Sequence, residues 1–260
     1  MKTSVRERIN KRFGSRRVFI VFSICFWLTV ATMLLSVIFY FAFSRHTVEK
    51  LAEHIALCVL AIILLFIPVF MRTRLKFQAP AFLQIIVTVF IIAHCVLGEI
   101  YRWYDYIPLY DKILHITAGA VIAILGFSIV YGFSKDEAGR MKLSPFFIAL
   151  FSFCFALALL AIWEIFEYSM DSIFGWNMQR YMNEFTETEI DGVIYWITSN
   201  PQGGLVDTME DIIVGVIGAA VFSVIGGLWV KKHPDDTSFY VTKIPQATGA
   251  AEAAKDKREF

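Results

Sequence analysis

Six long apolar runs dominate the sequence and restrict the folds that are open to it. They cover residues 18–44, 48–70, 79–97, 112–133, 145–168 and 205–230. Each is close to or longer than the roughly 20 residues that a helix needs to cross the hydrocarbon core of a bilayer. A soluble domain does not need this much apolar surface, in a chain that is 57% hydrophobic. The sequence therefore predicts an all-α polytopic membrane protein with six transmembrane helices.

Basic residues at every second connection give these helices an orientation. Residues 1–17 are rich in Lys and Arg, and further basic residues follow the second, fourth and sixth runs: Arg72, Arg74, Lys76, Lys135, Arg140, Lys142, Lys231 and Lys232. Because basic loops stay in the cytoplasm, we expect both termini there. Residues 1–17 would form a basic arm against anionic membrane lipid, 18–230 the transmembrane domain, and 231–260 a disordered cytoplasmic tail. With a net charge of +1, we expect no nucleic-acid partner.

The outer connections are acidic and aromatic, and only the segment 172–204 is long. Within it, alternating residues surround the pair Asp191-Gly192, which predicts a short β-hairpin with a type I′ turn. The segment is either a surface loop or a lid over the outer ends of the helices. The four cysteines all lie in apolar runs, so we expect buried thiols and neither disulfides nor a metal site.

Carboxylates and histidines gather at the outer ends of the last three runs. The residues concerned are Asp111 and His115 at the start of the fourth run, Glu164, Glu167 and Asp171 at the end of the fifth, and Asp207, Glu210 and Asp211 at the start of the sixth. Four of the five histidines lie on the outer side: His46, His54, His94 and His115. The spacing places each set on one face of its helix, and small residues such as Gly119 and Gly215 continue two of these faces. We therefore expect the three helix ends to meet inside the bundle.

Carboxylates and imidazoles without thiolates suit a divalent ion, which would also relieve the repulsion among several buried acids. The metal is expected to be Mg²⁺, Mn²⁺, Zn²⁺ or Fe²⁺. The predicted ligands are Asp111, His115, Glu164, Glu167, Asp207 and Asp211, with Glu164 and Glu167 also predicted to be catalytic. Alternatively, the acids cap helices or pair with Lys112, Arg102 or Arg180 in structural salt bridges.

Three motifs carry a resemblance to known membrane proteins: Tyr110-Asp111-Lys112-x-x-His115, Trp163-Glu164-x-x-Glu167-Tyr168, and Asp207-x3-Asp211 followed by Gly218-Ala219. In these motifs the second half of the chain resembles the VanZ-like membrane proteins and a related family of uncharacterised bacterial inner-membrane proteins. The resemblance implies a multi-pass protein of the bacterial cytoplasmic membrane. It supplies no reaction.

Three functions fit these features. The first is a metal-dependent enzyme at the extracytoplasmic face, acting on the headgroup of a membrane lipid or a lipid-linked substrate. The second is an ion-coupled transporter or carrier, although the inner halves of the last three runs carry no charges that would complete a pathway. The third is a non-catalytic structural or interaction protein whose outer acids stabilise helix ends.

Overall fold

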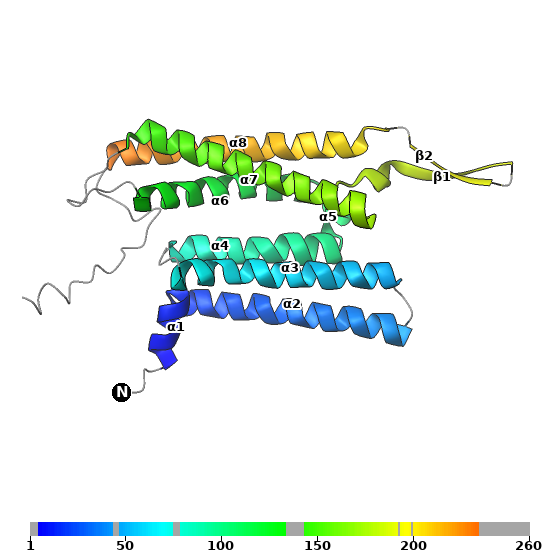
Figure 1. Cartoon of the computed structure of the whole chain (residues 1–260), viewed down its shortest axis with the longest axis horizontal. Helices are drawn as coiled ribbons and strands as arrows, with labels where there is room; N and C mark the ends of the chain where they lie inside the picture. The colour runs from blue at the N-terminus through cyan, green and yellow to red at the C-terminus, as the bar shows by residue number, and fades with distance from the viewer. Residues whose placement is uncertain are drawn as a thin grey trace, which may run out of the picture.

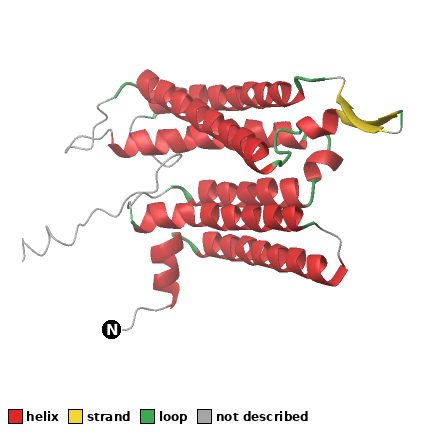
Figure 2. Ribbon diagram, turned by 45° about the vertical axis from the view of Figure 1, so that its right-hand side comes forward, coloured by secondary structure: helices red, strands yellow, loops and turns green. Residues whose placement is uncertain are grey.

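The chain folds into a bundle of long helices with one β-hairpin at its end, in a computed structural model that describes residues 5–43, 47–74, 79–133, 143–191, 193–198 and 200–233 (Figures 1 and 2). The first elements are α1 (Val5–Phe13), α2 (Arg16–Phe43), α3 (Val48–Thr73), α4 (Ala81–Ile91), the π-helix η1 (Ile92–Ile100) and α5 (Trp103–Tyr106). The others are α6 (Tyr110–Phe133), α7 (Pro145–Phe174), the 3₁₀-helix η2 (Tyr181–Glu184), β1 (Phe185–Ile190), β2 (Val193–Thr198) and α8 (Gly203–Lys232).

Six of the described helices are long and apolar enough to span a membrane, which confirms the predicted number. They are α2, α3, α4 continued by η1, α6, α7 and α8. The helix α1 and the end of α8 lie at one end of the bundle, and the hairpin lies at the other (Figure 1). Four of the basic residues used for the orientation lie outside the described residues: Lys76, Lys135, Arg140 and Lys142. His46 and most of the predicted tail also lie outside them.

The helix α7 is longer than its apolar run predicts. Its start is fixed by Ser144, whose hydroxyl accepts a hydrogen bond from the amide of Phe147, and by Pro145 in the first turn. Its end is fixed by Gly175, which adopts a left-handed conformation with φ +67°. The predicted end at residue 168 is therefore wrong by six residues, since the helix continues to Phe174. Glu164 and Glu167 consequently lie within the helix and not at its last turn.

The long helices form two groups, α2 to η1 and α6 to α8, which are separate layers in Figure 1. The first group has a core of Phe22, Ala61, Leu65 and Val96. Cys25, Cys58 and Cys95 are buried in it as predicted, and they carry free thiols. Cys154, in contrast, is exposed, because it lies on the outward face of α7, so the prediction that it is buried is wrong.

Small residues let α6 and α8 pack with their backbones in contact. A Cβ atom at Gly119 would collide with the carbonyl oxygen of Gly215, and one at Gly218 would collide with the carbonyl oxygen of Ile116. Ala123 and Ala219 continue this contact and are fully buried. Close approach through small residues is how membrane helices associate where lipid replaces water. The contact holds the N-terminal halves of α6 and α8 side by side.

The predicted hairpin is present. Strands β1 and β2 are antiparallel, with Ile190 opposite Val193 across a two-residue turn. Asp191 has φ +52°, as a type I′ turn requires, and Gly192 lies outside the described residues. The hairpin extends beyond the helix ends (Figure 1), while the residues just before it, 177–181, lie against α7 and α8. These contacts attach the preceding segment to the two helices, and whether 172–204 acts as a lid or is a surface loop stays a prediction.

Candidate metal centre

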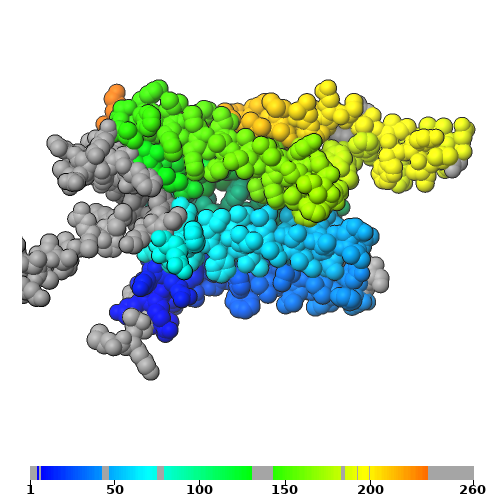
Figure 3. All heavy atoms as spheres, viewed as in Figure 1, coloured from blue at the N-terminus to red at the C-terminus, as the bar shows by residue number. Residues whose placement is uncertain are grey.

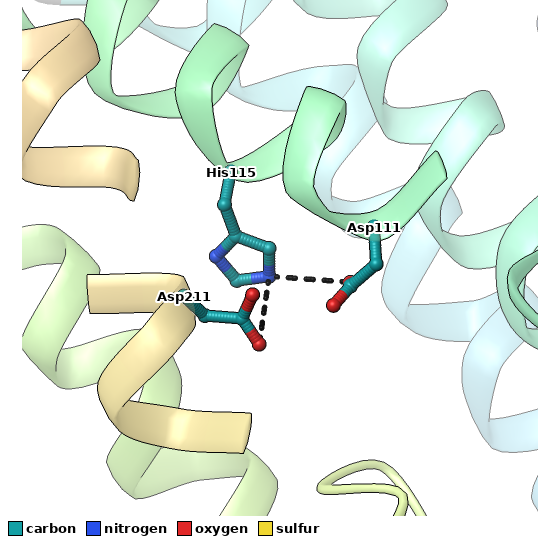
Figure 4. Close-up of side chains that lie close together, drawn as sticks. All are labelled: Asp111, His115 and Asp211. Atoms are coloured by element: carbon teal, nitrogen blue, oxygen red, sulfur yellow. Dashed lines mark ion pairs between the residues drawn. The ribbon is translucent and has the colours of Figure 1, made fainter. Parts of the chain in front are cut away.

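Asp111, His115 and Asp211 come together near the N-terminal ends of α6 and α8 (Figure 4). The Nε2 atom of His115 lies 3.5 Å from Oδ1 of Asp111 and 3.8 Å from Oδ2 of Asp211. One ligand atom from each residue lies within 4.8 Å of the others. The side chain of His115 is 6% exposed and that of Asp211 only 1%. The predicted convergence of these two helix ends therefore holds. It produces a group with two oxygen donors and one nitrogen donor, in which His115 and Asp211 are buried and Asp111 is 21% exposed.

Lys112 lies beside this group and contacts more carboxylates than any other described cation. Its Nζ atom is 2.8 Å from Asp211, 3.3 Å from Glu210, 3.5 Å from Asp111 and 3.7 Å from Asp207. The ammonium thus compensates part of the negative charge. It contacts Oδ1 of Asp211, whereas Oδ2 of the same carboxylate faces His115. The carboxylate of Asp211 therefore pairs with Lys112 through one oxygen and faces His115 with the other.

Glu164 adds a third helix to the site. Its Oε1 atom is 3.8 Å from Nδ1 of His115, on the opposite side of the ring from Asp111. Both residues are about 95% buried, and neither Nδ1 of His115 nor Oε2 of Glu164 has a hydrogen-bond partner in the described part of the chain. An unsatisfied buried polar atom costs about 1–3 kcal/mol, so native proteins pair such atoms with protein, water or a ligand. These two atoms mark a place where a polar ligand would be favourable.

The other predicted ligands lie nearby but outside the group of three. The side chain of Glu167 accepts a hydrogen bond of 2.7 Å from Nε1 of Trp163 and is buried one turn further along α7. The Oδ1 atom of Asp207 is 3.7 Å from Nζ of Lys112, and Asp207 does not belong to the group of three. Asp171 accepts hydrogen bonds from the backbone amides of Met178 and Gln179, so it anchors the segment before the hairpin.

Sequence reasoning missed a second charged network, centred on Arg180. Its guanidinium donates to Glu99 over 2.9 Å and stacks on the ring of Tyr104 at 4.1 Å. Burial alone would lower the pKa of Arg180, but the surrounding carboxylates, Glu99 first, outweigh that effect and raise it. Glu99 could have been singled out because a carboxylate at the end of an apolar span is costly without a partner.

A cavity of about 780 Å³ opens between α7 and α8, beside the group formed by Asp111, His115 and Asp211. Its wall includes Glu164, Asp171 and Tyr168 from α7, Thr208 from α8, and Gln179 and Tyr181 from the segment before the hairpin. The side-chain amide of Gln179 donates to the hydroxyl of Thr208 over 2.8 Å and so ties this segment to α8. The volume lies in the ordinary range of small-molecule sites. Glu164 is thus shared by the cavity wall and the surroundings of His115.

Comparison with known proteins agrees with the fold. The model of a family described as predicted membrane protein (DUF2238) matches residues 26–232. An uncharacterised protein from Thermotoga maritima is 28% identical over 149 residues, which are 56% of this chain and 57% of the relative, so the match spans little more than half of either protein. No solved structure matches the chain. The membrane-protein part of the resemblance is thereby supported, and its VanZ-like part stays a prediction. Because the family model covers most of the sequence, the chain belongs to the DUF2238 family of predicted membrane proteins.

Proposed function

We propose that this integral membrane protein binds a divalent metal ion at its extracytoplasmic face and acts there as an enzyme on the headgroup of a lipid or lipid-linked substrate. The observation that carries the proposal is the setting of His115, which has Asp111 and Asp211 on one side of its ring and Glu164 on the other. Three helices supply these carboxylates, and Lys112 is the cation in contact with two of them. A divalent ion would supply the missing positive charge.

The donor set limits the metal and its chemistry. Two carboxylates and an imidazole suit Mg²⁺, Mn²⁺, Zn²⁺ or Fe²⁺, and such an ion polarises a phosphoryl or carbonyl oxygen and lowers the pKa of bound water. Asp111, His115 and Asp211 would hold it. Glu164 lies where the site meets the cavity, so it is placed to accept a proton from water or substrate. A catalytic role for Glu167 and metal binding by Asp207 remain predictions from the sequence.

The depth of the site favours a headgroup as the substrate. Asp111 and His115 occupy the first two turns of α6, and Asp211 lies in the third turn of α8. With both termini in the cytoplasm, these turns lie level with the outer headgroups. The cavity between α7 and α8 opens at the same level. A polar group still attached to its lipid could therefore reach Glu164 without leaving the membrane surface.

A structural role is the second candidate, and Lys112 is the observation that favours it. An ammonium in contact with four carboxylates can stabilise three helix ends without any metal. In that case Asp211 and Lys112 form a fixed ion pair, and a protonated His115 pairs with Asp111. The two candidates differ in one measurable quantity, the metal content of the purified protein.

The test is elemental analysis of the full chain after purification in detergent and exposure to Mg²⁺, Mn²⁺, Zn²⁺ and Fe²⁺ in turn. We expect about one ion per chain in the wild type, and loss of that ion in His115→Ala and in Asp211→Asn. Glu210→Gln is the matched control on α8, since Glu210 also contacts Lys112 but is 58% exposed and lies outside the group of three, and it should keep its ion. A wild-type protein that retains none of these ions would refute the enzyme proposal and leave the structural one.

A further inference from the structure

A second cavity, of about 510 Å³, lies on the other side of His115, between the two groups of helices. Residues of α3, α4, η1, α6 and α7 line it, and most of them are aliphatic or aromatic. Figure 3 shows the surface hollowed between α3 and α7, where deeper residues are visible. The polar members of its wall include His94 and His115, both at the outer end. The cavity is therefore apolar along its length and polar at one end.

The position of the cavity determines what can enter it. Ile67 of α3 and Ile162 of α7 line it and are 43% and 58% exposed, on surfaces that face lipid in a membrane-spanning helix. The opening therefore leads into the bilayer and not into water. Water does not fill apolar cavities, because it finds too few hydrogen-bond partners there. The surrounding bilayer offers hydrocarbon chains as the occupant, and entering the cavity does not expose them to water.

His94 supplies a hydrogen-bonding group at the outer end of the cavity. Its Nδ1 atom is hydrogen-bonded to the hydroxyl of Tyr104, and its Nε2 atom is buried with no partner in the described part of the chain. Burial raises the pKa of Tyr104 well above its usual range, so this hydroxyl keeps its proton and can donate it to Nδ1. The proton of a neutral His94 ring is then on Nε2. An oxygen acceptor at this level would satisfy that N–H group.

The cavity is long enough for the ester-proximal part of one lipid chain. From His115 to Ile122 the cavity follows α6 for seven residues, which is about 10 Å of helix. In the outer leaflet, the ester oxygens of a glycerophospholipid lie at the border between the headgroups and the hydrocarbon core. His94 and His115 are near the outer ends of their spans, at that border. An acyl chain lying inward from the histidines would thus bring its ester oxygen to His94.

We propose that this cavity binds one acyl chain of a glycerophospholipid that enters from the bilayer between α3 and α7. Its oxygen-bearing end contacts His94 and lies beside His115, and its headgroup lies toward Glu164. The inference rests on the proposed function only for what happens at the headgroup. It makes the substrate class specific: an intact bilayer phospholipid, bound through its chain on one side of His115 and through its headgroup on the other.

The experiment places the full chain in vesicles of phosphatidylethanolamine and phosphatidylglycerol. A small part of the phosphatidylglycerol carries a photoreactive diazirine on one acyl chain. After irradiation, mass spectrometry locates the adducts along the chain. We expect adducts on the cavity residues Ala118, Ile122 and Leu159, in excess of those on Ile213 and Ile217, which are exposed on α8 away from the cavity.

Two neighbouring residues on α3 provide a matched pair of variants. Leu64→Trp fills the cavity, and Ile63→Trp places the same side chain on the exposed face of the helix. We expect adducts in the cavity to fall about tenfold in Leu64→Trp and to remain in Ile63→Trp. His94→Phe keeps an aromatic ring and removes the donor, and loss of one hydrogen bond should lower the adducts about two- to tenfold. Thermal unfolding shows that each variant is folded, and Ile122→Phe replaces Leu64→Trp if that variant is not.

The outcomes separate this inference from the proposed function. Adducts confined to bilayer-facing residues, or cavity adducts undiminished in a folded Leu64→Trp protein, would overturn the lipid site. Metal content is measured on the same samples, and no substitution on α3 alters a proposed ligand. Bound metal without cavity adducts therefore refutes the lipid site alone. Cavity adducts in a protein without metal refute the metal centre alone.

Discussion

Replacing Lys112 by Met tests the charge balance on which the proposed metal centre depends. The Nζ atom of Lys112 is 2.8 Å from Oδ1 of Asp211, and the side chain of Asp211 is only 1% exposed. Met keeps most of the length of the side chain and removes its charge. The substitution leaves Asp211 as a buried carboxylate that faces Asp111 and His115 without its ammonium partner.

The expected loss of stability follows from the burial of the ion pair between Lys112 and Asp211. Removing one partner of a buried ion pair costs about 3–5 kcal/mol, because the other charge stays buried and unpaired. Since the side chain of Lys112 is 23% exposed, we take the lower end, ~3 kcal/mol. For a chain of this size, that destabilisation lowers the melting temperature by about 6–12 °C.

Lys50→Met is the matched control on the same side of the membrane. Its ammonium is 2.7 Å from Glu53, but its side chain is 40% exposed, and exposed pairs contribute less than about 1 kcal/mol. Thermal unfolding of both variants in detergent with a chelator measures the difference. Equal melting temperatures for Lys112→Met and Lys50→Met would show that the Lys112 pair is not the buried interaction we describe.

Addition of metal then distinguishes the two candidate functions. A ligand that binds only the folded state at a hundred times its dissociation constant stabilises by about 2.7 kcal/mol. In Lys112→Met an ion meets both oxygens of Asp211 without a competing ammonium, so the variant should gain more stability from Mn²⁺ or Zn²⁺ than the wild type. A melting temperature that does not change with metal in either protein would refute the metal centre and favour a structural ion-pair network.

Two further predictions concern the fold around the site. Gly218→Ala should destabilise the protein by about 1–3 kcal/mol, since its Cβ would collide with the carbonyl oxygen of Ile116, whereas Gly204→Ala should be nearly neutral, because its nearest neighbour would be 3.4 Å away. Arg180→Met should cost about 3 kcal/mol by leaving the buried carboxylate of Glu99 unpaired. Arg102→Met should cost less than about 1 kcal/mol, since that side chain is 61% exposed. Melting temperatures of the four variants check both predictions, and similar values within either pair would contradict the packing or the pairing described.

The number of spans and the hairpin follow from the sequence because each depends on local pattern. A transmembrane helix is recognised from one continuous apolar run, and the hairpin from alternation about Asp191. The sequence does not give the end of a helix that continues beyond its apolar run. The end of α7 is an example, since Gly175 and not the last apolar residue terminates the helix.

The candidate site was partly predictable for the same reason. Residues four apart on one helix share a face, so Asp111 with His115 could be paired from spacing alone, and the small residues indicated which faces pack. Spacing does not give the rotation of α7 relative to α6 and α8. That rotation brings Glu164 to His115 and leaves Glu167 against Trp163. The central place of Lys112 depends on the same tertiary geometry.

The helix η1 was beyond the reach of sequence patterns. Its residues Ile92–Ile100 form a π-helix, in which the amide of Tyr101 bonds to the carbonyl of Val96 five residues earlier. Side-chain periodicity cannot separate this from an α-helix over nine residues. Yet η1 carries both His94, which lines the apolar cavity between the two groups of helices, and Glu99, which binds Arg180. The helix η1 thus connects the apolar cavity with the Arg180 network, the two features that sequence reasoning missed. Segments of π-helix are rare and occur often at functional sites.

His115 is the residue at which the two proposed halves of the site meet. Its Nε2 atom faces the carboxylates of Asp111 and Asp211, its Nδ1 atom faces Glu164, and its ring forms part of the apolar cavity wall. A soluble substrate would need only the outer cavity beside Glu164. A histidine that also borders a cavity open to the bilayer is explained by a substrate that stays anchored in lipid while its polar end is bound. For that reason we propose a lipid, and not a small soluble molecule, as the substrate, since a lipid would occupy both cavities.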